Sequence, residues 1–199
     1  MKSVVVKPLE EKYLDKVVRI HQDVLGYTFN SRLGYNHLAF MYRIMARFDE
    51  AYVRVAFVED QPVGVISGTL DVDKTRSVIF RSFKRSQWMN LAKHLLKRPS
   101  LIAEWWKGNM IGRTVYFEGF PVKAILTTIA IDPKHQGKGI GKCMVNALES
   151  YFKLRNIQYY LLDTLSKNIG AREFYKSLGF QQVEIRADSI IFVKGLFDR

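Results

Sequence analysis

The 199 residues of this chain suffice for one globular domain with a substantial core, and 48% of them are hydrophobic while 25% are charged. This composition excludes an intrinsically disordered chain, and no apolar run reaches the ~20 residues that a membrane-spanning helix needs. Lysine and arginine number 31 against 19 acidic residues, and the resulting charge of +12 favours anionic ligands or surfaces without choosing among them.

The apolar pattern of the chain alternates between the two-residue period of strands and the longer period of helices. In chain order it predicts a strand at residues 3–7, helices over 10–25 and 31–48, strands at 51–58, 62–70 and 122–131, a helix from about 141 to 152, a strand at 159–163, a helix at 168–178, and strands at 180–185 and 189–193. Asn30 and Ser31 are expected to cap the second helix, and residues 59–61 to form a hairpin turn. Residues 71–121 exceed an ordinary connection and are expected to form an insertion within a single domain over residues 1–199.

The bend before the helix that starts near Gly141 is rich in glycine. Its residues are Gln136, Gly137, Lys138, Gly139, Ile140, Gly141 and Lys142. Backbone N–H groups and the positive end of the helix converge there, which favours an anion. The glycines lack the Cβ atoms that would keep a pyrophosphate from the backbone, and the lysines add positive charge. The predicted ligand is a diphosphate.

Two well-known phosphate-binding loops fit this bend poorly. A P-loop requires glycine where Gln136 stands and serine or threonine where Cys143 stands. A dinucleotide-binding fingerprint requires the spacing G-x-G-x-x-G near the first strand, whereas the glycines here alternate late in the chain. The bend therefore favours neither a nucleoside triphosphate nor a nicotinamide cofactor.

The bend and a second motif together resemble the GNAT acetyltransferase superfamily. Residues 136–141 match its pyrophosphate arm, Q/R-x-x-G-x-G/A, and follow Ile131, Asp132 and Pro133 at the end of a strand. The second family pattern, N-x-x-A-x-x-F/L-Y-x-x-x-G-F, is matched by Asn168, Ala171, Phe174, Tyr175, Gly179 and Phe180. The resemblance covers residues 122–193 by motif and residues 1–70 by element order only, and it does not cover the insertion.

The resemblance implies an α/β (α+β) fold with a mixed, mostly antiparallel sheet flanked by helices, and the residues themselves add a basic helical insertion before the fourth strand. It also implies an acyl-CoA cleft where residues 126–131 and 159–163 separate, with acetyl-CoA or another short acyl-CoA as cosubstrate. The residues that it assigns to coenzyme A binding are Thr128, Ile129, Ile131, Gln136, Gly137, Lys138, Gly139, Ile140, Gly141, Lys142, Asn168 and Tyr175.

The reaction that the resemblance implies is transfer of an acetyl or other short acyl group to a primary amine, such as an amino sugar or another small amine. An N–H near Ile129 would stabilise the oxyanion, and Tyr175 would protonate the leaving thiolate. The amine needs a base, because an amine with a pKa of about 10.4 is protonated at pH 7. Some relatives carry a glutamate early in the fourth strand, but residues 124–125 are apolar here, so Glu118 and Asp163 are the candidate bases.

Residues outside the two motifs bear on metal binding, disulfides, cellular location and an alternative function. No metal site is expected, because the four histidines lack ligand spacing and Cys143 suits a small core residue. The single cysteine excludes an internal disulfide, and the absence of a signal-peptide pattern predicts a cytoplasmic location. A non-catalytic module that binds coenzyme A or a membrane surface is the alternative function.

The insertion concentrates the positive charge of the chain. Between residues 74 and 107, nine basic residues accompany one acid, Glu104, and aromatic and leucine side chains are interleaved. Pro99 is expected to divide two short amphipathic helices. Three interpretations remain open: a lid that shapes the acceptor pocket, peripheral contact with an anionic membrane surface, and, least favoured, contact with nucleic acid.

Overall fold

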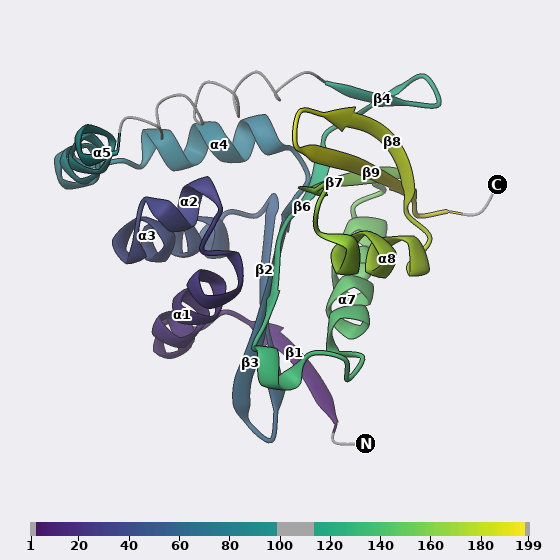
Figure 1. Ribbon diagram of the computed structural model, residues 1–199, viewed down its shortest axis with the longest axis horizontal. Coiled ribbons are helices and arrows are strands. Elements are labelled where there is room, and N and C mark those ends of the chain that lie inside the picture. Colours follow the sequence, from purple (N-terminus) through teal and green to yellow (C-terminus); the bar gives the residue numbers. More distant parts are fainter. Residues whose placement is uncertain (1–2, 99–113, 198–199) are drawn as a thin grey trace.

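The structure is a computed structural model that describes residues 3–98 and 114–197, and a seven-stranded sheet forms its centre (Figure 1). The strands are β1 (Val4–Pro8), β2 (Ala51–Val58), β3 (Gln61–Thr69), β6 (Ala124–Ile131), β7 (Tyr159–Leu165), β8 (Gln181–Arg186) and β9 (Ser189–Gly195). They lie in the order β1-β2-β3-β6-β7-β9-β8, and β6 and β7 are the parallel pair in an otherwise antiparallel sheet. The expected mixed, mostly antiparallel sheet is confirmed.

Helices cover both faces of this sheet (Figure 1). They are the 3-10 turn η1 (Glu11–Tyr13), α1 (Leu14–Leu25), α2 (Phe29–Arg32), α3 (Tyr35–Arg47), α4 (Val72–Arg81), α5 (Arg85–Lys97), the 3-10 turn η2 (Pro133–His135), α7 (Ile140–Leu154) and α8 (Ile169–Ser177). Val17 of α1 and Leu38 of α3 are buried against one face, and Met144 and Leu148 of α7 against the other. The apolar stripes that predicted these helices therefore form two cores, one on each side of the sheet.

The start of the second long helix differs from the prediction. Asn30 and Ser31 lie within the short helix α2, and Gly34 precedes α3 with a φ of 90°. This left-handed conformation favours glycine and interrupts the helix. The predicted caps, Asn30 and Ser31, therefore lie in the short helix α2 and not at the start of α3. Ser31 instead is buried and bonds the Thr28 hydroxyl at 3.1 Å.

The insertion contains more structure than the sequence pattern indicated. Asp71 caps α4 by accepting hydrogen bonds from the N–H groups of Asp73 and Lys74, each at 3.0 Å. Helices α4 and α5 both lie before Pro99 and are separated by residues 82–84; the expected division of two helices at Pro99 lies outside the described residues. A hairpin of β4 (Val115–Phe117) and β5 (Phe120–Val122), which was not predicted, leads into β6.

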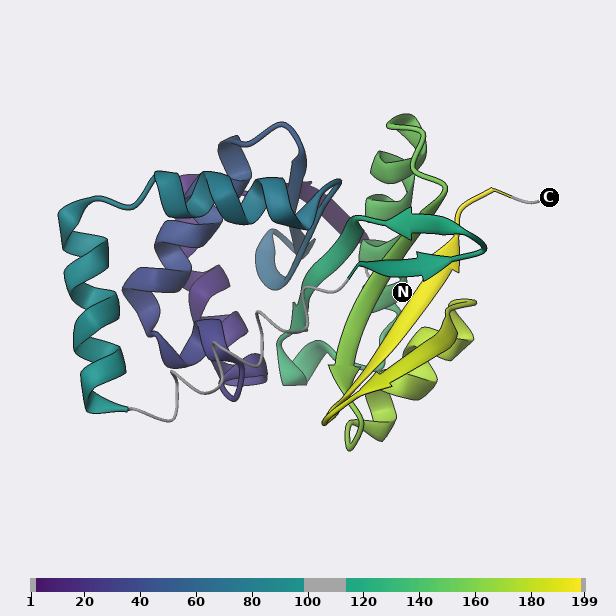
Figure 2. The ribbon, with the colours of Figure 1, turned by 90° about the horizontal axis from the view of Figure 1, so that it is seen from above.

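Seen from above, helices α4 and α5 of the insertion extend away from the sheet, whereas the hairpin of β4 and β5 lies beside it (Figure 2). Helix α4 runs outward over α3, and α5 stands at the far end of the molecule from β8 and β9. The junction of α4 and α5 is held by aromatic contacts, because Phe83 lies 5.3 Å from Phe40 of α3 and 5.1 Å from Trp88 between ring centroids. These contacts attach the junction of α4 and α5 to α3, whereas Thr75 of α4 bonds Thr69 of β3 and Val115 of β4 packs with Ile191 and Val193 of β9.

Candidate active site

The parallel pair of strands separates after a short contact. Ala124 pairs with Tyr160 and Ile125 with Leu161, and no further residues of β6 and β7 are in register. Residues 126–131 of β6 remain paired with β3 on their other side. The predicted separation of these strands is therefore present, and it leaves unpaired backbone N–H and C=O groups along the free edge of β6.

A β-bulge interrupts β6 at this opening. Ser67 of β3 pairs with Thr128 and Gly68 pairs with Leu126, so Thr127 is an extra residue in the strand. The bulge reverses the alternation of side chains, because Leu126 and Ile129 both pack on the α7 side although three positions separate them. Such a bulge bends a strand and re-aims its backbone groups at the point where the opening begins.

The glycine-rich bend lies between the open end of β6 and α7. Gly139 precedes α7 with a φ of 77° and supplies no side-chain cap, and Gly137 has a φ of 73°. An added Cβ would meet nothing within 4 Å at either position, so open space surrounds the backbone there. Uncapped N–H groups at a helix start, with space in front of them, fit the predicted diphosphate.

Other residues of the bend shape it from inside. Gly141 is required by packing, because an added Cβ would lie 2.9 Å from the Phe174 ring of α8. Gln136 Nε2 donates to the Ile131 carbonyl at 2.9 Å, so its side chain ties the bend to the strand end. Lys138 Nζ donates to the Lys134 carbonyl at 2.7 Å, and its charge remains beside the helix start. The structure therefore gives Gln136 and Gly141 structural roles that the motif alone does not reveal.

Tyr175 lies in α8 with its side chain buried to 6% exposure. Its ring packs against Phe174, Phe180 and Phe192, with centroid distances of 5.3, 5.6 and 6.2 Å. Burial raises the pKa of the phenol, and the neighbouring Asp163 and Tyr27 raise it further. The hydroxyl is therefore protonated at neutral pH.

Asp163 lies on the part of β7 that has separated from β6. The residue is open to solvent, yet burial raises the pKa of its carboxyl group. A side chain on the wall of a concave site has both properties, because water reaches it while protein atoms surround it. Asp163 lies near enough to Tyr175 for its charge to raise the pKa of the Tyr175 phenol.

A residue that the sequence did not single out faces the same site. Tyr27 lies between α1 and α2, and its pKa is raised by burial, lowered by a side-chain hydrogen bond with Asn168 and raised by Asp163. Asn168 also caps α8, since its Oδ1 accepts a hydrogen bond from the Ala171 N–H at 3.1 Å. The loop before α2 is thus brought to the α8 end of the opening, which no sequence motif indicated.

Glu118, the other candidate base, lies elsewhere. It occupies the turn between β4 and β5 with a φ of 52°, and it accepts a hydrogen bond from the Tyr159 hydroxyl at 2.5 Å. Tyr159 begins β7 at the end that remains beside β6, four residues before Asp163, which is roughly 13 Å along a strand. The structure brings Asp163, and not Glu118, together with Tyr175.

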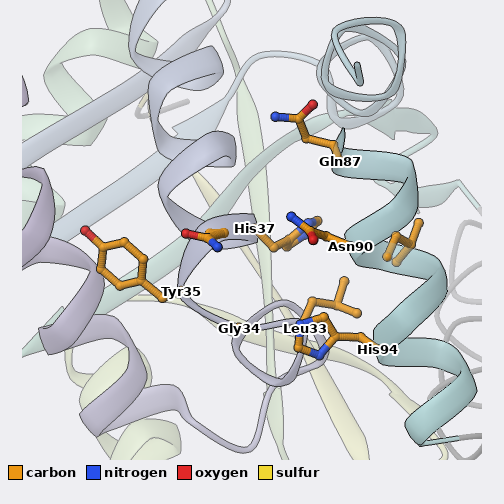
Figure 3. A pocket seen from close by; sticks show the side chains of 9 residues that line it. Leu33, Gly34, Tyr35, His37, Gln87, Asn90 and His94 are labelled. Atoms are coloured by element: carbon orange, nitrogen blue, oxygen red, sulfur yellow. The ribbon is translucent and has the colours of Figure 1, made fainter. Parts of the chain in front are cut away.

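A pocket of about 220 Å³ lies away from this opening (Figure 3). It is lined by Leu33, Gly34, Tyr35, Asn36, His37, Gln87, Asn90, Leu91 and His94, which belong to the start of α3 and to α5. Burial, with a contribution from the charge of His94, lowers the pKa of His37 to about 4. Because β6, β7, α7 and α8 contribute nothing to its wall, this pocket is distinct from the opening that the motifs predicted.

Within residues 3–98 and 114–197, no group of three or more His, Cys, Asp and Glu side chains gathers around a point where a metal ion could bind. No helix in the same part of the chain has both the length and the apolar composition to span a membrane.

Comparison with known proteins identifies relatives of this chain. A model of the acetyltransferase (GNAT) family matches residues 14–180. The ribosomal protein bS18-alanine N-acetyltransferase of Escherichia coli is 33% identical over 64 residues, which are 32% of this chain and 43% of that protein. An uncharacterised N-acetyltransferase of Methanocaldococcus jannaschii is 40% identical over 57 residues, 29% of this chain and 25% of that protein. The match spans less than half the length of each of these relatives.

Solved structures share the fold over nearly the whole chain. The paiA N-acetyltransferase of Thermoplasma acidophilum, solved in complex with coenzyme A, has a TM-score of 0.65 at 14% identity, covering 97% of this chain and 99% of that one. The ribosomal-protein-S18-alanine N-acetyltransferase of Escherichia coli has a TM-score of 0.63 at 15% identity, covering 99% and 96%. At these identities, the likeness establishes the fold and leaves the acceptor open.

Proposed function

The chain belongs to the acetyltransferase (GNAT) family, and from this premise we propose that it transfers an acetyl group from acetyl-CoA, or another short acyl-CoA, to a small primary amine. One observation carries the proposal: the separation of β6 from β7 opens directly beside the uncapped start of α7. A thioester and a diphosphate are the two ends of acetyl-CoA that such a pair of sites can hold together.

The residues of the bend and of β6 would hold the cosubstrate. The N–H groups of residues 137–142 would bind the diphosphate, with Lys138 and Lys142 adding charge. The free edge of residues 128–131 would pair with the amide groups of the pantetheine arm, as an added strand does. The Ile129 N–H, just after the bulge, would then polarise the thioester carbonyl and stabilise the oxyanion.

Proton transfers fall to the two groups that the structure brings together. The amine attacks the thioester carbon, and Asp163 accepts the proton that the amine loses. When the C–S bond breaks, the Tyr175 hydroxyl donates its proton to the thiolate. With ordinary pKa values of about 10 for a phenol and 8.5 for a thiol, this transfer is uphill by about 2 kcal/mol. The raised pKa of the Tyr175 phenol increases this cost, and burial of the leaving thiolate, which would raise the thiol pKa, would offset part of it. Asn168 would hold the loop beside the pantetheine arm, since it caps α8 there.

The acceptor would approach from the side of α1 and α2. Tyr27 lies on that side and shares the electrostatic environment of Asp163, so it would form part of the acceptor wall. A small amine, such as an amino sugar, offers hydroxyl groups to such a polar wall. A relative with a matched segment acts on an alanine of a ribosomal protein, so a protein N-terminus is the competing acceptor.

We also propose that the insertion touches an anionic membrane surface. Helix α5 has no buried residue, and Trp88, Met89 and Leu96 are 49%, 49% and 84% exposed. Exposed basic residues accompany them: Arg81, Lys84, Arg85, Lys93, Lys97 and Arg98. Residues 82–98 contain no acidic residue. Apolar and basic side chains on one exposed helix suit the interface of the anionic cytoplasmic leaflet, which would place the protein in the cytoplasm in peripheral contact with it.

Release of free thiol from acetyl-CoA tests the transfer reaction. The purified protein would be supplied with amino sugars, polyamines, amino acids and peptides with free N-termini, and turnover with at least one amine is expected. Gly139→Asp serves as the control for binding at the bend. Tight binding of acetyl-CoA without turnover on any amine would refute catalysis and favour a non-catalytic coenzyme A-binding module.

A further inference from the structure

The bulge of β6 is surrounded by polar side chains that the reaction scheme does not use. Ser67 of β3 is 1% exposed, and its hydroxyl is 2.7 Å from the hydroxyl of Thr127, the extra residue of the bulge. Thr128, the next residue, pairs with Ser67 in the register of the two strands. Both strands therefore fasten the bulge through side chains as well as through their backbones.

A second group of side chains reaches the bulge from the helices. Tyr42 of α3 is 3% exposed; burial raises the pKa of its phenol, and the nearby Thr128 side chain lowers it by a smaller amount. On its other side, the Tyr42 hydroxyl is 2.6 Å from His21 Nδ1 of α1, with the two rings nearly perpendicular at 74°. Burial lowers the pKa of His21 to about 4, so the imidazole is neutral at neutral pH.

These polar groups lie in an otherwise apolar core. Val17, Val18, Leu38, Met45, Val65 and Ala130 belong to the same buried cluster on this face of the sheet. The chain of contacts ends at His21 Nε2, which is buried and has no hydrogen-bond partner among residues 3–98 and 114–197. A buried nitrogen without a partner is unfavourable, so apolar side chains would stabilise this core better than the observed ones. Their presence requires a role other than stability.

We propose that Ser67, Tyr42 and His21 are positioning residues that hold the peptide between Thr128 and Ile129 in the orientation that oxyanion stabilisation needs. The inference rests on the proposed acetyl transfer. A donor must lie within a few tenths of an ångström of its place, and a bulged strand with a free edge lacks the second neighbour that would hold it. The side-chain contacts replace that neighbour: Ser67 holds Thr127, and Tyr42, itself oriented by His21, holds Thr128.

Removal of the hydroxyl groups at both ends of one contact tests this role. Tyr42→Phe and Thr128→Val should each lower kcat about tenfold to a hundredfold, because a misplaced donor loses transition-state stabilisation. The dissociation constant for acetyl-CoA should stay within about twofold. The double variant should be no slower than the slower single variant, since both remove the same contact. Thr128→Ser keeps the hydroxyl and should restore most of the activity.

Tyr151→Phe is the matched control, because the Tyr151 hydroxyl donates to the Asp49 carbonyl at 2.7 Å, away from the bulge. It should cost stability without lowering kcat. If Tyr42→Phe behaves like this control, or if the effects of Tyr42→Phe and Thr128→Val add in the double variant, the positioning role is refuted. Should Tyr42→Phe not fold, Thr128→Val and Thr128→Ser provide the same test at a half-buried site.

A measurement without turnover separates this inference from the proposed reaction. In ¹H–¹⁵N spectra of the free protein, Tyr42→Phe should shift the amide signals of Thr128 and Ile129 more than Tyr151→Phe does. Unchanged signals at these two residues would overturn the positioning role even in an active enzyme. If the signals shift in a protein that acetylates no amine, the positioning role is supported and only the proposed acetyl transfer is refuted.

Discussion

Helices α7 and α5 have similar lengths, 15 and 13 residues, and differ completely in burial. Helix α7 buries Ile140, Gly141, Met144, Val145, Leu148 and Phe152, whereas α5 buries no residue. Both have the spacing of an amphipathic helix. The difference is that α7 follows β6 through a tight bend and lies on the sheet, while α5 is reached through α4 and rests beside α3 (Figure 2).

An amphipathic pattern thus states which side of a helix is apolar, and the fold decides whether another element covers it. At α7 the covered side fixes the helix, and its free N-terminus can serve a ligand. At α5 the apolar residues stay exposed beside basic ones, which leaves a surface for a partner. Comparable substitutions in the two helices should therefore affect different properties: ligand binding at the start of α7, and contact with a partner surface at α5.

Gly139→Asp should weaken acetyl-CoA binding at least a hundredfold. The aspartate would place a negative charge at the start of α7 in a backbone conformation, φ 77°, that suits glycine. Calorimetry with acetyl-CoA measures the loss. Ala92→Asp adds the same charge to an exposed position of α5 and should leave the affinity unchanged. Equal affinity of the folded Gly139→Asp protein would remove the bend from the proposed site.

Tyr175→Phe should lower kcat about tenfold to a thousandfold while the affinity for acetyl-CoA changes little. The phenol assists only when the thiolate leaves, so its loss affects the transition state and not the bound ground state. Steady-state kinetics and calorimetry separate the two quantities. Trp88→Phe, an aromatic substitution on α5, should not change kcat with a small amine. A fully active Tyr175→Phe enzyme would reduce Tyr175 to a packing residue.

Asp163→Asn should lower kcat/KM about tenfold to a hundredfold and change its pH dependence. Burial raises the pKa of Asp163, so activity that needs its carboxylate should fall as pH decreases through that raised value. The acid limb of the pH profile should therefore disappear in Asp163→Asn. Glu118→Gln at the closed end of β7 should keep the acid limb, and the reverse result would make Glu118 the base.

Lys93→Ala combined with Lys97→Ala should weaken binding to acidic vesicles by about 2 kcal/mol, roughly thirtyfold, at low salt. The wild-type binding should itself fall steeply as salt rises. Co-sedimentation with acidic and neutral vesicles measures both effects. Lys7→Ala with Lys153→Ala removes the same charge from exposed positions outside the insertion and should have a small effect. Absence of binding to acidic vesicles at any salt would favour a lid over the membrane contact.

The sequence pattern predicted the strands of the main sheet and the glycine-rich bend with little error, because these features depend on residues close along the chain. The separation of β6 and β7 was expected from the family resemblance. The left-handed conformations of Gly137 and Gly139 are an example. It did not predict the break before α3 or the hairpin of β4 and β5, since short elements carry too few residues for a periodic pattern. The helices of the insertion were expected, but their division at residues 82–84 was not.

The candidate site shows the same limit at the level of single residues. Tyr175 and Asn168 belong to one motif and were identified together. Tyr27 carries no motif, and it reaches Asn168 only because the loop before α2 is folded against the end of β7. The contact between His21 and Tyr42 joins two helices in the same way, so neither side chain could be linked to β6 from the chain alone.

The sequence by itself determined the family, the element order and the glycine-rich bend before α7, because local spacing of glycines and apolar residues constrains the backbone directly. Only the tertiary structure decided which acid accompanies Tyr175 and which amphipathic helix remains uncovered. Asp163 and Glu118 are both ordinary acids in the sequence, but the fold places Asp163 on the separated part of β7 and Glu118 against Tyr159 at the paired start of β7. Likewise α5 differs from α7 because burial depends on the elements that the fold brings beside a helix.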